Sequence, residues 1–325
     1  MDIFLLIFEL AAFAAFGALL FLEWRKRDSF KIMELFAGGV FGMLLEIGNI
    51  AMSDSYHYSE DFLISMGGVP IAIGLGWSVI IFSAMRISDS YAVRERNRIW
   101  MDGLCVLILD LAIDAVAIRL GFWGWTINYN QEWFGVPYEN LIAWIFVGVS
   151  FSLVMRFLKK QEKSTKKFAF LAFLSPFTAY GILLIFLLAL GIFLRAVYFF
   201  AVQSQSGSVG LIPPLEELYH EKVALIKGYL LFLMTVILVV YWGLCWKKSE
   251  GKFKNGFEIL PFVFFIGIHF YFLTVLLATG WASELPTLLW IGIFSFALHL
   301  VYHLLPFVEK KRVSKEVPIE NDRLE

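Results

Sequence analysis

Charged residues are scarce in this chain, and that scarcity indicates its class. Asp, Glu, Lys and Arg make up 17% of the 325 residues, whereas 59% are hydrophobic. Soluble domains have about 25% charged and about 45–50% apolar residues, so this balance indicates a membrane protein. No stripe of Lys and Arg with interleaved aromatic residues lies outside the short loops, which argues against nucleic-acid binding.

Cysteine is nearly absent, and the usual metal and cofactor motifs are missing. Cys105 and Cys245 lie far apart in apolar segments, which excludes a disulfide framework and a paired-cysteine metal site. There is no Gly-rich phosphate loop, nucleophile elbow or HExxH motif. His299 and His303 have helical spacing without an accompanying carboxylate, so we expect them to pair with backbone or other side chains. We therefore predict no metal and no cofactor.

Long hydrophobic runs, in contrast, are abundant. A membrane-spanning helix needs about 20 apolar residues. The stretches that approach this length are 3–22, 32–50, 63–86, 99–123, 140–158, 168–194, 223–246, 257–279 and 286–306. They predict an all-α protein, a polytopic transmembrane helix bundle of about nine spans. In this prediction residues 1–308 form a single transmembrane helical domain, and 309–325 form a charged cytoplasmic tail.

The loops predict the orientation of the bundle. Basic residues crowd into every second connection, while the alternate loops carry Asp and Glu with almost no Lys or Arg. The segments that together hold 23 of the 27 Lys and Arg residues are 25–31, 86–98, 156–167, 247–254 and 310–323. By the positive-inside rule the N-terminus lies outside and the C-terminus inside, in a multi-pass protein of the cell membrane. The longest outer segment, 203–222, either caps the outer mouth of the bundle or is a solvated connector.

Of the acids inside the apolar stretches, three are candidates for function. Asp110 and Asp114 belong to the stretch 99–123, and Glu46 lies in the outer part of 32–50. A charge at the bilayer centre costs about 2.5–3.5 kcal/mol on insertion scales, so membrane acids are rare and usually functional. Because Asp110 and Asp114 are four residues apart, their side chains lie on one helix face, one turn from each other.

These acids suggest a proton donor for an apolar substrate. Burial penalises the charged form of a carboxyl group, and two neighbouring carboxyls can share one proton. A neutral acid in an apolar pocket can protonate a hydrocarbon double bond, and the resulting carbocation needs π faces, water or carboxylates to stabilise it. The alternative is a structural role, in which the pair binds Arg119 or hydrogen-bonds to a neighbouring helix.

Aromatic side chains cluster near the acid-bearing stretches. The candidates for a substrate pocket are Tyr56, Tyr58, Trp77, Trp123, Trp125 and Trp144. Cation–π contacts give about 0.5–2 kcal/mol each, so a ring of such residues would stabilise a carbocation. The same residue types form the interfacial belt of any membrane protein, so only their clustering favours a pocket.

One part of the sequence repeats. Gly68-Val69-Pro70 precedes Trp77, and Gly135-Val136-Pro137 precedes Trp144 with the same spacing. Glu46 and Asp114 lie 24 and 23 residues before these prolines. The pattern indicates a parallel duplicated hairpin, as some membrane folds are built, although coincidence in a chain rich in Gly and Trp is the alternative.

The same residues carry a resemblance to a known family. Leu45-Glu46, the two tyrosines of Tyr56-x-Tyr58, the run GVPIAIGLGW, and above all LDLAIDAVAIRLGFWGWTINYNQEWFGVPYENLIAW resemble the carotenoid biosynthesis membrane proteins. The best-described members of that family are bisanhydrobacterioruberin hydratases, which add water to terminal isoprenoid double bonds. The resemblance covers about residues 40–160 and adds Pro137 and Asn140 to the substrate-binding set.

The resemblance implies an integral membrane enzyme of carotenoid or isoprenoid biosynthesis, with a hydrophobic isoprenoid or carotenoid as substrate. In a carotenoid hydratase, Asp114 or Asp110 would protonate the terminal alkene, the other would orient water, and Glu46 would help to line the pocket. A carotenoid end-group cyclase would begin with the same protonation. A proton-coupled transporter would use the acids as a relay. The oligomeric state and the role of the C-terminal half stay open.

Overall fold

The computed structural model describes residues 2–52, 56–161, 165–203, 215–249 and 259–316, and these are almost entirely helical, as predicted. Most of the predicted outer cap at 203–222 and the end of the predicted tail lie outside the described residues. The helices are α1 (Ile3–Lys26), α2 (Ser29–Met52), α3 (Ile71–Ser90), α4 (Glu95–Ala117), α5 (Tyr138–Lys160), α6 (Thr165–Gln203), α7 (Leu215–Ser249), α8 (Ile259–Ala278), α9 (Trp281–Glu284) and α10 (Pro286–Glu316). The strands are β1 (Tyr56–Tyr58), β2 (Ser65–Met66), β3 (Val69–Pro70) and β4 (Trp123–Trp125).

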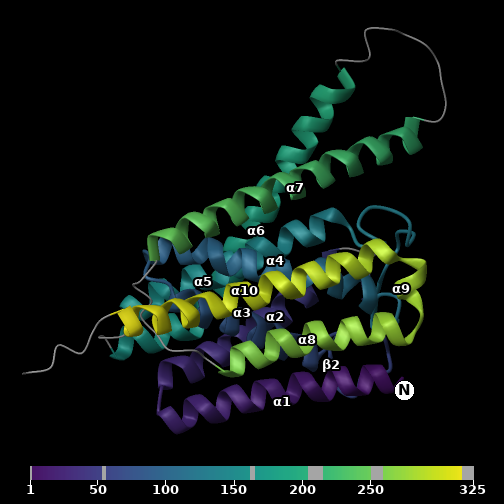
Figure 1. The fold of residues 1–325 in the computed structure, drawn as a ribbon. Coiled ribbons are helices and arrows are strands. Elements are labelled where there is room, and N and C mark those ends of the chain that lie inside the picture. Colours follow the sequence, from purple (N-terminus) through teal and green to yellow (C-terminus); the bar gives the residue numbers. More distant parts are fainter. Residues whose placement is uncertain (1, 53–55, 162–164, 204–214, 250–258, 317–325) are drawn as a thin grey trace, which may run out of the picture.

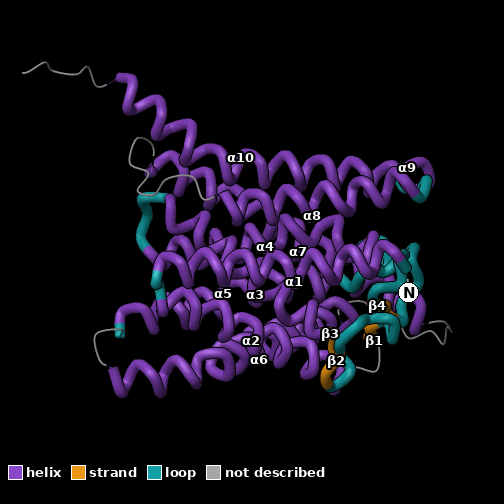
Figure 2. The backbone as a smooth tube through the Cα atoms, turned by 90° about the horizontal axis from the view of Figure 1, so that it is seen from below, coloured by secondary structure: helices purple, strands orange, loops and turns teal. Residues whose placement is uncertain are grey.

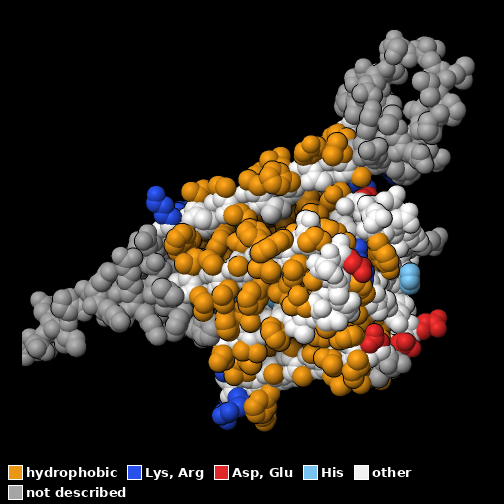
Figure 3. All heavy atoms as spheres, turned by 45° about the vertical axis from the view of Figure 1, so that its right-hand side comes forward, with side chains coloured by type: hydrophobic (Ala, Val, Ile, Leu, Met, Phe, Trp, Pro, Cys, Tyr) orange, Lys and Arg blue, Asp and Glu red, His pale blue; other side chains and the backbone are white. Residues whose placement is uncertain are grey.

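The long helices lie side by side and run back and forth along one direction (Figures 1 and 2). The four short strands, α9 and the N-terminus gather at one end of the bundle (Figure 2). We call this the strand end. Figure 3 shows a broad hydrophobic surface between a strand end with Asp and Glu and an opposite end with Lys and Arg. This separation of charge is the one that the loop composition predicts.

Seven of the described helices are long and apolar enough to cross a membrane: α1, α3, α5, α6, α7, α8 and α10. The helices α2 and α4, with 24 and 23 residues, lie among them but are not in that set. α4 carries three buried acids, Asp102, Asp110 and Asp114. The count of nine spans and the orientation of the termini therefore stay predictions, whereas a multi-pass helical membrane protein agrees with the structure.

Two predicted stretches are longer than the helices they contain. The stretch 63–86 was expected to be one span, but its first residues form the β2–β3 hairpin and α3 begins only at Ile71. Gly67 and Gly68 have φ of 61° and 79°, a conformation that breaks a helix and favours glycine. Likewise α4 ends at Ala117, and Gly121 with φ of 70° turns the chain toward β4. Apolar composition alone did not reveal these turns, because the hairpin residues are themselves largely hydrophobic.

The centre of the bundle is formed by α3, α4 and α5. The apolar windows of α3 and α5 are each 78% buried, whereas those of α6 and α7 are 11% buried. Helix α4 approaches α5 closely at two glycines, since a Cβ on Gly148 would lie 3.1 Å from the Cα of Gly103. Small residues at such crossings allow the close backbone contact typical of membrane bundles.

The predicted duplication agrees with the geometry of the two halves. Gly68 and Gly135 both have positive φ, 79° and 89°, and both precede the start of a helix. Pro70 and Pro137 are the N-cap residues of α3 and α5. The hairpins α2–α3 and α4–α5 are therefore built alike at their turns.

The two units meet about a local twofold relation. At the offset that relates Pro70 to Pro137, Tyr56 is equivalent to Trp123 and Tyr58 to Trp125. Strands β1 and β4 pair antiparallel with Tyr56 opposite Trp125 and Tyr58 opposite Trp123. Equivalent residues thus contact each other reciprocally, as they do in a twofold-symmetric interface.

The tryptophans Trp77 and Trp144, equivalent at the same offset, are also in contact, with ring centroids 4.3 Å apart.

Candidate active site

A cavity of about 370 Å³ lies beside this pair of tryptophans, between the two hairpin units and α1 and α8. Its volume is near the lower end of the range of about 300–1,000 Å³ for small-molecule sites. Eight of the eleven site residues predicted from the sequence line it. They are Glu46, Tyr56, Tyr58, Trp77, Asp114, Trp123, Asn140 and Trp144. Asp110, Trp125 and Pro137 do not line the cavity, and their places are described below.

Asp114 presents its carboxyl group to this cavity. The residue lies in the last turn of α4 and is 4% exposed. The amide Nδ2 of Asn140 donates a hydrogen bond to its Oδ2 at 2.5 Å. Asn140 lies in the first turn of α5, and Pro137 is the residue that starts this helix. Pro137 therefore fixes the start of the helix that carries Asn140; it does not line the cavity, and its role in substrate binding stays a prediction.

Asp110 lies one turn before Asp114 and is completely buried. Among the described residues its carboxyl oxygens have no hydrogen-bond partner outside the pair with Asp114. A buried carboxyl group without such a partner is costly. A purely structural role for Asp110 would need a hydrogen bond that offsets this cost, and the described residues provide none outside the pair. The acid pair thus has one member on the cavity wall and one behind it.

Arg119 does not neutralise the acid pair. Its Nη1 donates hydrogen bonds to the backbone oxygens of Ala115 at 2.5 Å and Phe134 at 3.0 Å, and its guanidinium lies 4.9 Å from the ring centroid of Tyr129. The side chain therefore holds the loop that precedes α5. The structural alternative in which Arg119 binds the two aspartates is wrong.

Lys227 of α7 ties this loop to the start of α5, because it forms ion pairs with Glu132 of the loop at 3.2 Å and with Glu139 of α5 at 2.5 Å.

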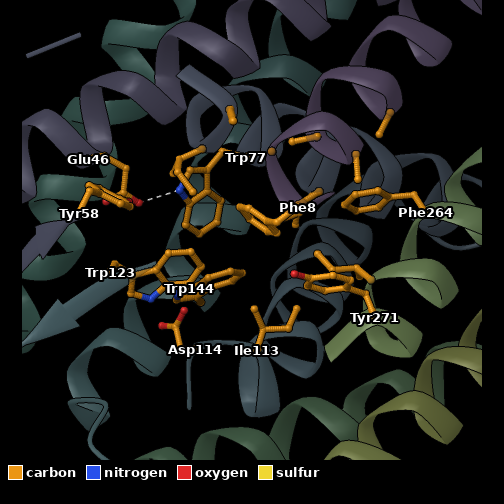
Figure 4. Close-up of a pocket in the computed structure, with 18 of the residues that line it drawn as sticks. Phe8, Glu46, Tyr58, Trp77, Ile113, Asp114, Trp123, Trp144, Phe264 and Tyr271 are labelled. Atoms are coloured by element: carbon orange, nitrogen blue, oxygen red, sulfur yellow. Dashed lines mark hydrogen bonds between the residues drawn. The ribbon is translucent and has the colours of Figure 1, made fainter. Parts of the chain in front are cut away.

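Glu46 is the second carboxyl group on the cavity wall. It is 6% exposed, and the indole Nε1 of Trp77 donates a hydrogen bond to its Oε1 at 2.7 Å. In Figure 4, Glu46 and Tyr58 lie on one side of the tryptophan rings and Asp114 lies on the other. The cavity therefore presents two acids, from α2 and α4, with aromatic rings between them.

The paired strands β1 and β4 bring four aromatic residues to the strand end of the cavity. The rings of Tyr56 and Trp125 are in contact with centroids 4.3 Å apart, and those of Tyr58 and Trp123 lie 6.1 Å apart. Trp125 packs against Tyr56 and supports it without lining the cavity. Burial raises the pKa of both phenols well above the ordinary value, so Tyr56 and Tyr58 stay neutral hydroxyl groups.

The wall formed by α1 and α8 was not predicted from the sequence. Its lining residues are apolar: Phe8, Ala11, Ala12, Ala14 and Ala15 from α1, and Val263, Phe264, Gly267, Ile268 and Tyr271 from α8. A sequence signal in α1 was its run of small residues, Ala11, Ala12, Ala14, Ala15, Gly17 and Ala18, among bulky apolar ones. The C-terminal half, for which the sequence indicated no role, thus contributes α8 to this wall.

The buried histidines form a separate cluster. His299 contacts His269 at 2.6 Å and the backbone oxygen of Cys105 at 2.9 Å, and Nδ1 of His303 contacts the backbone oxygen of His299 at 2.8 Å. This pairing with backbone and side chains is confirmed for both His299 and His303. Within the described ranges, no group of three or more His, Cys, Asp or Glu is placed to hold a metal ion.

Comparison with known proteins identifies the family. A family model described as "carotenoid biosynthesis protein" matches residues 5–205, which is more than half of the chain. The chain therefore belongs to the carotenoid biosynthesis protein family, as its resemblance indicated. The match includes the predicted core at 40–160 and extends beyond it at both ends. No curated protein and no solved structure matches the chain.

Proposed function

We propose that this protein is a membrane enzyme that adds water to a terminal carbon–carbon double bond of an acyclic carotenoid or related isoprenoid. One observation carries the proposal: Asp114 lies on the wall of a largely apolar, aromatic cavity, with a second buried carboxyl directly behind it. Such a cavity suits a hydrocarbon substrate, and hydrocarbons offer an acid only their double bonds to protonate. The family supports a role in carotenoid biosynthesis but leaves the reaction itself open.

In this proposal Asp114 is the general acid. Its carboxyl proton is transferred to the inner, hydrogen-bearing carbon of the terminal double bond, a new C–H bond forms as the π bond breaks, and a tertiary carbocation remains on the outer carbon, which carries two methyl groups. Asp110 acts through Asp114. Since it does not reach the cavity, it is a positioning residue that favours the protonated form of Asp114 by opposing double ionisation of the pair.

The carbocation would form beside aromatic faces and carboxylates. Trp77, Trp123 and Trp144 line the cavity, and each cation–π contact contributes about 0.5–2 kcal/mol, more where water is excluded. The Asp114 carboxylate left after proton transfer adds a negative charge at short range. Fixed groups of this kind stabilise charge that develops in the transition state without needing to reorganise.

Water then completes the reaction. Glu46, held by Trp77, accepts a hydrogen bond from a water molecule and orients it toward the cation. The water oxygen bonds to the cationic carbon, and its excess proton returns to the Asp114 carboxylate, which restores the acid. The sum is one alkene and one water converted to one tertiary alcohol. Glu46 thus takes the role of orienting water that the sequence analysis gave to a member of the aspartate pair.

The test is expression of the chain in cells that accumulate an acyclic carotenoid of C40 or C50 length, followed by mass analysis of the pigments. A gain of one water supports the proposal. A product of unchanged mass but shifted chromatographic retention would establish cyclisation instead, and unaltered pigments with both substrates would refute an activity on carotenoids.

Asp114→Asn tests the assigned acid. General acid catalysis contributes roughly 10²- to 10⁴-fold, so we expect a loss of at least about a hundredfold in product formation. Asp61→Asn makes the same chemical change on an exposed loop and should leave the activity unchanged. Both variants are compared at equal amounts of membrane-inserted protein. Full activity of Asp114→Asn would refute the assignment of the acid.

A further inference from the structure

The cavity extends from the acids to the apolar outer surface of the bundle. Its lining includes Ala11 and Ala14 of α1 and Val263 and Gly267 of α8, and all four are exposed residues. Val263 is 54% exposed, whereas Asp114, at the other end of the same cavity, is 4% exposed. In Figure 4, Phe264 and Tyr271 of α8 lie on the side of the cavity away from Glu46. The cavity is thus open along a gap between α1 and α8, which we call the lateral gap.

The lateral gap runs along the helices. At one end Phe8 contacts Tyr271, with ring centroids 6.5 Å apart, and toward the other end Ala15 and Phe264 pack against the same buried cluster, which includes Phe16 and Phe82. Seven residues of helix separate Phe8 from Ala15, a rise of about 10 Å. Over this length α1 and α8 present mostly small or apolar side chains to the cavity, and none of their lining residues is charged. A hydrocarbon chain can therefore lie in the gap without leaving a charged group unpaired.

The surroundings of the gap are apolar as well. Only 28% and 33% of the residues in the membrane-spanning windows of α1 and α8 are buried, so most residues of both helices keep some exposed surface. Exposed hydrophobic residues flank the gap on both helices, among them Ile7, Leu10 and Phe270. A ligand that passes through the gap moves from acyl chains to the cavity without crossing water.

The volume limits how much of a substrate the cavity can hold. About 370 Å³ is close to the lower end of the range for drug-sized ligands, and a carotenoid is a far longer molecule whose length is comparable to the bilayer core. One end of such a chain fits beside Asp114, and the rest has to leave through the gap.

We infer that the lateral gap between α1 and α8 is the substrate entrance, and that it holds the polyene chain while one end alone reaches Asp114. The inference rests on the proposed function for the identity of the substrate. It adds that the polyene stays partly in the bilayer, and that each binding event modifies one end. A substrate with two equivalent ends is therefore released after the first addition and must bind again.

Gly267→Leu tests the entrance. A Cβ on Gly267 would meet nothing within 4 Å, so the backbone accepts a larger residue, which then occupies the gap. Gly191→Leu on α6 is the matched control, because a Cβ there also meets nothing within 4 Å and Gly191 does not line the cavity. Because the leucine side chain would overlap the space of the bound chain, we expect a roughly tenfold to hundredfold loss of carotenoid affinity for Gly267→Leu and none for Gly191→Leu.

Affinity is measured without turnover. Purified Asp114→Asn protein in detergent, with and without Gly267→Leu, is titrated with an acyclic carotenoid, and quenching of tryptophan fluorescence reports binding near Trp77 and Trp144. Equal affinity with and without Gly267→Leu would overturn the entrance, and so would failure of the parent protein to bind the carotenoid. The two proposals can fail separately. If the wild type produces no hydrated pigment but Gly267→Leu still abolishes carotenoid binding, the proposed reaction is refuted and the entrance is supported.

The time course of the wild-type reaction tests whether each binding event hydrates only one end of the substrate. With a substrate that has two equivalent ends, the singly hydrated product should accumulate before the doubly hydrated one. Appearance of the doubly hydrated product without the intermediate would contradict release between the two additions.

Discussion

The hydrogen bond between Trp77 and Glu46 offers a quantitative check on the site, because both partners are buried and the bond can be removed from either side. Glu46→Met removes the acceptor with a similar volume, and Trp77→Phe removes the donor while it keeps an aromatic ring. Glu46→Met leaves the Trp77 indole N–H without this acceptor, and Trp77→Phe leaves Glu46 without this donor. The double variant removes both polar groups. Together they form a double-mutant cycle.

The structure suggests the size of the coupling. Trp77 is 5% exposed, Glu46 is 6% exposed, and the bond length is 2.7 Å. A buried hydrogen-bond group left without a partner costs about 1–3 kcal/mol. Trp77→Phe should therefore destabilise the protein by that amount in addition to the loss of ring contact with Trp144. In the Glu46→Met background the additional cost disappears, so we expect an interaction energy of about 1–2 kcal/mol.

The assay is thermal unfolding of the wild type, the two single variants and the double variant in the same detergent. Unfolding is monitored as the fraction of protein that remains monodisperse after heating. The control cycle pairs Glu46→Met with Trp144→Phe, which removes an equal part of an indole from the same ring pair but leaves the Trp77–Glu46 bond intact. We expect near-additive effects in the control and clear non-additivity in the test cycle. Additive effects in both cycles would refute the reasoning that Trp77 holds Glu46 in place.

Two further substitutions test the bundle around the site. Arg156→Met removes the ion-pair partner of the fully buried Asp102, 2.9 Å away, and should destabilise the protein by about 3–5 kcal/mol in thermal unfolding. Arg156→Lys keeps the positive charge and should be less damaging. An unchanged unfolding temperature of Arg156→Met would contradict a buried ion pair there. Gly42→Ala would place a Cβ 2.6 Å from the Cβ of Trp77, so α2 and α3 must separate at a cost of about 1–3 kcal/mol and with reduced product formation. Gly39→Ala, whose Cβ would meet its nearest atom at 3.6 Å, is the control, and equal effects of the two would disprove the tight packing.

Much of the fold follows from local properties of the sequence. The apolar runs predicted the long helices, because a membrane span needs an uninterrupted apolar length. The loop charges predicted which loops share an end, and Figure 3 shows the charges separated in that way. The repeated Gly-Val-Pro indicated two similar hairpins, since positive φ at Gly68 and Gly135 and the helix start after Pro70 and Pro137 are local requirements of the backbone.

The polar part of the site was predictable for a related reason. An acid or an amide inside an apolar stretch is conspicuous, because lipid makes it costly wherever it lacks a function or a partner. Glu46 and Asp114 were therefore identified from the sequence. The spacing of Asp110 and Asp114 could not show which of the two lines a cavity, since both lie on the same helix face. Only the packing of α5, which brings Asn140 to Asp114, and the position of the cavity decide which of the two aspartates lies on the cavity wall.

The apolar wall of α1 and α8 could be found only in the tertiary structure. In a soluble protein, hydrophobic periodicity separates the buried face of a helix from the face in water. In a bilayer both the lipid and a hydrocarbon-binding cavity are apolar, so Ala14 or Gly267 facing the cavity has the same chemistry as a residue facing the acyl chains. The sequence by itself determined the helices, the acids and the duplicated turns. Which helices surround the acids, and where that cavity opens, depends on contacts between segments as distant as α1 and α8, for which apolar side chains carry no sequence signal.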